Sequence, residues 1–116
     1  MNYDYNQAKT VATGADAALV FIYSDSGEGY ITVAGNEGDR NNLTAWEGGN
    51  KLVEQVASVN KNTMVIMHAP GQMDIESFVN NENVTAIIWA GMPGAESGNA
   101  ITVSPESRVF SLIFVD

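Results

Sequence analysis

The side chains best suited to chemistry gather in one polar segment, residues 24–44, which directly follows an apolar run. Its acidic residues are Asp25, Glu28, Glu37 and Asp39. Glu28 stands between two glycines, so no bulky neighbour keeps a substrate away from its carboxyl group. A carboxyl group in such a place can give or take a proton, and Tyr30, two residues later, adds an aromatic ring.

Other kinds of site receive little support from the residue types. Four acidic side chains on one loop could attract a cation, but their spacing does not match a calcium-binding EF-hand loop. The chain has no cysteine, which rules out disulfides and a thiolate nucleophile. We expect no metal and no cofactor. The sole histidine, His68, has no visible triad partner, and we expect it to be a hydrogen-bonded structural residue.

Three short apolar runs predict buried strands over residues 17–23, 63–68 and 84–90. Each run is nearly continuous rather than alternating, which is typical of strands covered on both faces of a parallel sheet. Trp89, in the third run, is therefore expected in the core. The polar segment begins where the first strand ends, and open α/β sheets place their ligand sites at that edge.

Helical segments are expected between these strands. Leu52, Val53, Val56 and Val59 are spaced to bury one stripe of a helix. Asp74 is a plausible cap for a short helix. The expected helices cover residues 4–14, 47–59, 74–79 and 94–102.

Strands that alternate with helices predict an α/β fold, a three-layer α/β/α sandwich with a mostly parallel sheet. The last apolar run, residues 109–115, is expected to form a final strand that is antiparallel or swapped between two copies. With 116 residues, the chain is expected to form one domain over residues 1–116.

The connection over residues 24–45 is much longer than a usual loop between a strand and a helix, and such loops are typically functional or disordered. Within it, Arg40 is expected to form an ion pair with its neighbour Asp39. Trp46 is expected to anchor the start of the next helix.

The formal net charge of −9 comes from 14 acidic and 5 basic residues. This balance argues against nucleic acid or an anionic membrane as a partner, since both require basic patches. No apolar run approaches the ~18 residues of a membrane span. The first ten residues lack the apolar core of a signal peptide. Two glycosylation sequons, Asn42-Leu43-Thr44 and Asn83-Val84-Thr85, matter only in a secretory setting.

Five blocks of the sequence carry a family resemblance: DSGEGYITV (25–33), GNEGDRNNLT (35–44), VNKNT (59–63), NVTAIIWAGMPG (83–94) and ESGNA (96–100). In this order they resemble the second domain of fungal β-glucosidases of glycoside hydrolase family 3. The resemblance covers about residues 15–100 and fades over residues 101–116. The chain thus looks like a truncated or diverged copy of that α/β sandwich domain.

In that family a (β/α)8-type barrel supplies the aspartate nucleophile and most of the sugar-binding residues, and the sandwich domain supplies the general acid/base. The resemblance implies that Glu28 is this acid/base and that Tyr30 lines the aglycone side of the site. It implies loop structure for Asp25 and Asp39. It also implies an extracellular protein.

The sequence contains no barrel, so the nucleophile is absent from this chain. We therefore expect a β-glucoside or oligosaccharide to be a substrate only when the domain is paired with a barrel. The isolated chain should be inactive in hydrolysis of β-D-glucosides. Two alternatives stay open: a non-catalytic stand-alone protein that binds a partner or forms a homodimer, and an independent carbohydrate binder that uses Tyr30 and the acidic loop.

Overall fold

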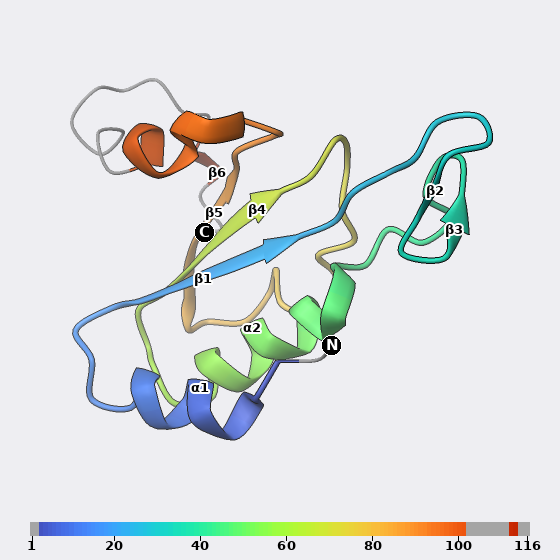
Figure 1. The fold of residues 1–116 in the computed structure, drawn as a ribbon. Coiled ribbons are helices and arrows are strands. Elements are labelled where there is room, and N and C mark those ends of the chain that lie inside the picture. The colour runs from blue at the N-terminus through green and yellow to red at the C-terminus, as the bar shows by residue number, and fades with distance from the viewer. Residues whose placement is uncertain (1–2, 102–111, 114–116) are drawn as a thin grey trace.

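The computed structural model describes residues 3–101 and 112–113 of the chain (Figure 1). Two helices and six strands have defined bounds: α1 (Tyr5–Ala12), β1 (Ala18–Tyr23), β2 (Thr32–Val33), β3 (Asn36–Glu37), α2 (Gly49–Ala57), β4 (Thr63–His68), β5 (Val84–Trp89) and β6 (Leu112–Ile113). Two 3-10 turns, η1 (Trp46–Gly48) and η2 (Gly94–Glu96), add to these, and residues 97–101 are helical.

The main sheet has the strand order β1-β4-β5-β6, and β2 pairs with β3 in a separate hairpin. Strands β1, β4 and β5 are parallel, whereas β6 runs antiparallel to β5. The α/β class and the mostly parallel sheet are therefore confirmed. The antiparallel direction of the last strand is confirmed at residues 112–113, and the rest of the run 109–115 lies outside the described residues. Because Tyr23 pairs with His68, the carboxyl ends of β1 and β4 lie side by side.

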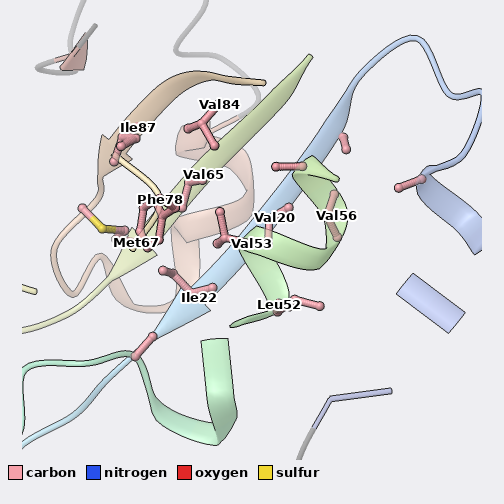
Figure 2. Packing of buried hydrophobic residues seen from close by; sticks show 14 residues of the cluster. Val20, Ile22, Leu52, Val53, Val56, Val65, Met67, Phe78, Val84 and Ile87 are labelled. Carbon is pink, nitrogen blue, oxygen red and sulfur yellow. The ribbon is translucent and has the colours of Figure 1, made fainter. Parts of the chain in front are cut away.

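The core lies between the sheet and α2, with α1 beside α2 on the same face (Figure 1). Val20 and Val65 are aligned in neighbouring strands, and Ile87 continues this row in β5. Val53 of α2 packs onto the same cluster and is completely buried (Figure 2). Residues 94–101 lie against the opposite face of the sheet, where the Ser97 hydroxyl group meets the His68 ring.

The prediction that the first strand is covered on both faces is wrong. The side chains of β1 alternate between buried and exposed. The exposed ones belong to Leu19 at 58%, Phe21 at 46% and Tyr23 at 41%. In the described part of the chain β1 is an edge strand, and on the second face Ser97 contacts His68 of the neighbouring strand β4.

Trp89 is not a core residue, contrary to the prediction. Its side chain is 48% exposed, and its indole nitrogen donates a hydrogen bond to the Ala69 carbonyl oxygen at 3.2 Å. Trp89 is the last residue of β5, so it lies at the edge of the sheet where the packed layers end. Its apolar neighbours in the sequence gave no sign of this position.

The expected helix over residues 74–79 is a single turn instead. The backbone amides of Phe78 and Val79 both donate to the Ile75 carbonyl oxygen, and no regular helix follows. The Asp74 carboxylate accepts the Glu76 amide at 3.0 Å, as a capping residue would. The turn buries the Phe78 ring, which is 1% exposed.

The helix expected over residues 47–59 is shorter and irregular at its start. Glu47, inside η1, has a φ of 56°, which interrupts the helical path before α2. The regular helix therefore begins at Gly49 and ends at Ala57. The predicted stripe is confirmed for Leu52, Val53 and Val56, which are buried, whereas Val59 lies beyond the end of α2 and is only partly buried.

Candidate functional site

An open cleft of about 840 Å³ lies beside the loop over residues 24–45. Glu28, Asp39 and Arg40 line it from this loop. The segment that follows β4, residues 70–72, lines its other side. Because both segments follow parallel strands, the cleft lies at the carboxyl edge of the sheet, where the sequence predicted a site.

The backbone around Glu28 is fixed by a tight turn. The Ile31 amide donates to the Glu28 carbonyl oxygen at 2.9 Å, and Gly29 adopts a φ of 57° within this turn. Two further bonds, from the Gly27 amide to the Gly38 carbonyl oxygen and from the Gly38 amide to the Ile31 carbonyl oxygen, tie the turn to the returning chain. The turn leaves the Glu28 side chain exposed at the cleft.

Gly27 is required by close packing of the backbone. A Cβ atom on Gly27 would lie 2.3 Å from the Ile31 carbonyl oxygen, so any side chain there would push the two segments apart. Sequence reasoning noted the glycines beside Glu28 as a sign of access. Gly27 in fact holds the turn in shape, and that turn presents the carboxyl group.

Tyr30 lies beside the cleft rather than in it. Its side chain is 88% exposed, and Ile31 next to it is 51% exposed. The chain then continues into β2 and β3, joined by Ala34 and Gly35 with φ values of 50° and 82°. Positive φ at both central residues gives the tight hairpin that suits the twist of paired strands. Tyr30 precedes this hairpin and is exposed to solvent at the rim of the cleft.

The Asn36 side chain organises the far side of the loop, and sequence reasoning missed it. Its amide nitrogen donates to the Asp39 carbonyl oxygen at 2.7 Å, and its oxygen accepts the Asn41 amide at 3.3 Å. Asparagine directly after a hairpin glycine was an available signal, because its side chain readily bonds to nearby backbone. One side chain thus fixes the path from β3 to Arg40.

Arg40 joins the two segments that line the cleft. Its guanidinium group donates to the Ser24 hydroxyl group and to the Gln72 carbonyl oxygen, and its backbone amide donates to the Ser26 hydroxyl group at 3.0 Å. The predicted ion pair between Arg40 and Asp39 is not present, although the structure describes both residues. Asp39 is exposed, so its hydrated carboxylate would gain little from the pairing, whereas Ser24 is 1% exposed and needs a partner.

The other acidic side chains of the loop do not assemble a second centre. The Asp25 carboxylate accepts the Ser26 amide at 2.8 Å, and Glu37 is exposed. Within residues 3–101 no three His, Asp or Glu side chains lie close enough together to hold a metal ion. None of the helices described is long and apolar enough to cross a membrane.

His68 and Trp46 hold the elements around the cleft in place. The His68 ring lies 2.9 Å from the Ser97 hydroxyl oxygen and stacks on Phe21 with a centroid distance of 6.2 Å. The predicted hydrogen bond of His68 is thus present, and a structural role stays a prediction. The Trp46 ring meets Tyr23 edge to face at 6.1 Å, which anchors the start of the helical region to the end of β1 as predicted.

Comparison with known proteins places the chain in a family. The model of the glycosyl hydrolase family 3 C-terminal domain matches residues 2–104. The chain belongs to this family. The resemblance drawn from the sequence blocks is thereby confirmed.

Two of the similar proteins are fungal and much longer than this chain. A probable beta-glucosidase of Arthroderma benhamiae is 56% identical over 100 residues, which are 86% of this chain and 12% of that protein. A probable beta-glucosidase L of Aspergillus terreus is 51% identical over 112 residues, 91% of this chain and 15% of that protein. The chain therefore spans only a small part of these relatives.

Two solved structures of fungal enzymes share the fold of this chain. The beta-D-glucoside glucohydrolase of Trichoderma reesei superposes with a TM-score of 0.86 at 46% identity, over 91% of this chain and 15% of that chain. A family 3 beta-glucosidase of Neurospora crassa gives 0.85 at 46% identity, over 93% of this chain and 13% of that chain. The chain has the fold of one region of these enzymes.

Proposed function

We propose that Glu28 is the general acid/base of a retaining β-glucosidase active site whose remaining parts lie outside this chain. The observation that carries the proposal is an exposed carboxyl group, held by a fixed turn, at a cleft on the carboxyl edge of the sheet. The family membership and the similarity to fungal β-glucosidases support a β-D-glucoside or an oligosaccharide as the substrate. By the same resemblance, the protein acts outside the cell.

The chemistry needs a second carboxyl group. A retaining glycosidase uses one carboxylate to attack the anomeric carbon and another, about 5–5.5 Å away, to protonate the leaving oxygen. We assign the attack to a carboxylate of a barrel domain. Asp25, the nearest acidic residue in the sequence, bonds to the backbone amide of Ser26. Without the barrel, the isolated chain should not hydrolyse β-glucosides.

A chimera tests the role of Glu28. The matching segment of the Trichoderma reesei glucohydrolase is replaced by this chain, and turnover of cellobiose and of an aryl glucoside is measured. Loss of a general acid lowers rates about 10²–10⁴-fold, so Glu28→Gln should reduce cellobiose hydrolysis by this order. In Glu28→Gln, the rate of bond cleavage should fall less for the aryl glucoside than for cellobiose, because the aryl leaving group needs little protonation.

Glu37→Gln is the matched control, because Glu37 is an exposed carboxylate of the same loop that does not line the cleft. It should leave both rates close to those of the chimera. Equal activity of the Glu28→Gln chimera and the control would contradict the proposal, as would Glu28-dependent turnover by the isolated chain.

We further propose that Tyr30 contacts the aglycone of the bound glucoside. Its ring is 88% exposed at the rim of the cleft and offers a flat apolar face. In the chimera, Tyr30→Ala should raise KM for cellobiose more than it lowers kcat, and Tyr30→Phe should retain most of the affinity. An unchanged KM in Tyr30→Ala would contradict this assignment.

The outer side of β1 favours a second candidate function, self-association of a stand-alone protein. Leu19 and Phe21 are exposed beside one another on an edge strand of the described sheet. Exposed apolar side chains on such an edge are suited to pairing with another chain. Light scattering should then show a homodimer that Leu19→Lys converts to monomers. A monomeric unsubstituted chain would contradict this candidate.

A further inference from the structure

We propose that Arg40 is a positioning residue for the general acid, because its hydrogen bonds set where the loop holds the Glu28 carboxyl group. The proposal rests on the role proposed for Glu28 and adds a second residue to it. Arg40 is the only basic residue among residues 24–44, and it lines the same cleft as Glu28. It acts through the loop that carries the acid rather than on the substrate.

Arg40 closes this loop at its base. Its backbone amide donates to the Ser26 hydroxyl group at 3.0 Å, and its guanidinium group donates to the Ser24 hydroxyl group. These bonds join points that are 14 and 16 residues apart in the chain. Glu28 follows Ser26 by two residues and lies inside the closed stretch. A change at Arg40 therefore reaches Glu28 through a short piece of backbone.

Arg40 also fixes the loop against the other side of the cleft. Its guanidinium group donates to the carbonyl oxygen of Gln72, which lines the side that faces the loop. A second bond between these segments, from the Asp74 amide to the Leu43 carbonyl oxygen at 2.8 Å, lies further from Glu28 in the chain. The bond to Gln72 thus sets how far the Glu28 segment stands from the facing side.

A guanidinium group is well suited to hold two such partners. It is planar, presents its donors as a rigid fork and stays charged at every working pH. Its partners here are neutral oxygens, and hydrogen bonds with one charged member are stronger than those between neutral groups. The Ser24 side chain is 1% exposed, and the Ser24 amide donates to the His68 carbonyl oxygen of β4 at 3.0 Å. Arg40 therefore fastens the loop to the sheet.

The position of Glu28 matters because proton transfer works only at short range. A general acid has to lie within about 2.6–3.2 Å of the oxygen that it protonates. In the proposed enzyme the attacking carboxylate belongs to another domain, so the distance from Glu28 to the scissile bond depends on how the loop is fastened. A misplacement of about 1 Å can cost about 10²-fold in rate.

A double-mutant cycle in the chimera with the Trichoderma reesei glucohydrolase tests the proposal. The measured quantity is kcat/KM, which reports bond cleavage. Arg40→Gln should lower it about 10–10²-fold for cellobiose and less for an aryl glucoside, as a misplaced acid would. In the Glu28→Gln background, the same substitution should lower it by no more than about 2-fold, because no acid remains to be misplaced.

Three further variants separate positioning from a general loss of structure. Arg40→Lys keeps the charge but loses the fork, so it should recover part of the lost rate. Ser24→Ala removes one guanidinium partner with little change in volume, and it should give a smaller loss with the same dependence on the leaving group. This variant keeps the test decisive if Arg40→Gln does not fold. Lys61→Gln is the matched control, an exposed cation that does not line the cleft, and it should leave both rates unchanged.

The same clamp can be followed in the chain alone. The Ile31 amide donates to the Glu28 carbonyl oxygen, so its hydrogen exchange reports on the turn that presents the acid. Arg40→Gln should accelerate this exchange, and Lys61→Gln should not.

Three results would overturn the role of Arg40 while leaving that of Glu28 intact. These are an equal factor of loss from Arg40→Gln with and without Glu28, equal losses for cellobiose and the aryl glucoside, and unchanged exchange at the Ile31 amide. A Glu28→Gln chimera with full activity on cellobiose would overturn both proposals together.

Discussion

In the core beneath α2, side chains such as Val53 and Phe78 are almost completely removed from water. The loop that presents Glu28 is built differently: within residues 24–44, all of which the structure describes, Ser24 and Gly38 alone are buried. The core is held by burial of apolar surface, which has no preferred direction. The loop is held by single directed bonds from Asn36 and Arg40.

This difference determines how each region should respond to substitution. Loss of an apolar side chain from the core reduces the stability of the whole domain, because α1, α2, β1, β4 and β5 all pack on the same cluster. Loss of a bond in the loop leaves that cluster intact and changes the position of Glu28. Four substitutions test this contrast, in order of decreasing effect.

Phe78→Ala should cause the largest loss of stability. The ring is 1% exposed, and its removal should cost about 3–5 kcal/mol in the free energy of unfolding measured with urea. Phe21→Ala is the matched control at a phenylalanine that is 46% exposed, and it should cost no more than about 1 kcal/mol. Similar losses for both would mean that the outer side of β1 is covered in solution.

Gly27→Ala should disturb the loop by steric overlap. The added Cβ atom would lie 2.3 Å from the Ile31 carbonyl oxygen, and relief of such a clash typically costs about 1–3 kcal/mol. Hydrogen exchange at the Ile31 and Gly38 amides should accelerate. Gly98→Ala, where the Cβ atom meets nothing within 4 Å, should leave these rates unchanged. Unchanged exchange in Gly27→Ala would show that the turn adapts freely.

Asn36→Ala should have a smaller and more local effect. It removes the bonds to the Asp39 carbonyl oxygen and from the Asn41 amide, each worth about 0.5–1.5 kcal/mol. Faster hydrogen exchange at the Asn41 amide, with little change in global unfolding, is the expected result. Asn80→Ala, at an exposed asparagine outside the loop, serves as the control. A global loss equal to that of Phe78→Ala would contradict the division between the two regions.

Tyr3→Phe should have the smallest effect, visible only at alkaline pH. Burial, and then the charges of Tyr23, Glu47 and Tyr5, raise the pKa of Tyr3 above its usual 10.0. The unfolded chain therefore releases this proton first, so the stability that Tyr3 contributes is complete below pH 10 and is lost as the pH rises through its folded pKa. Urea unfolding above pH 10 should show a shallower decline for Tyr3→Phe. Parallel declines would exclude Tyr3 as the cause.

Much of the fold could be predicted because strand formation depends on local apolar runs. The three parallel strands were predicted within one residue of their bounds, and the stripe formed by Leu52, Val53 and Val56 was predicted correctly. The turn at residues 74–79 could not be distinguished from a helix, since Asp74 bonds to Glu76 in the way that a helix cap does.

At the site, the sequence was sufficient to locate Glu28 at the carboxyl end of the first strand. It could not give the partners of Arg40, because Ser24 lies 16 residues away and Gln72 lies 32 residues away in the chain. The neighbouring Asp39 was the obvious partner by sequence. The fold made a better one available by bringing the ends of β1 and β4 together.

The sequence by itself therefore determined the order of elements, the family and the segment that carries the carboxyl group, since each depends on residues close together in the chain. The tertiary structure alone decided which side of β1 is covered and which bonds hold the Glu28 loop. These properties depend on segments that meet only when the chain folds.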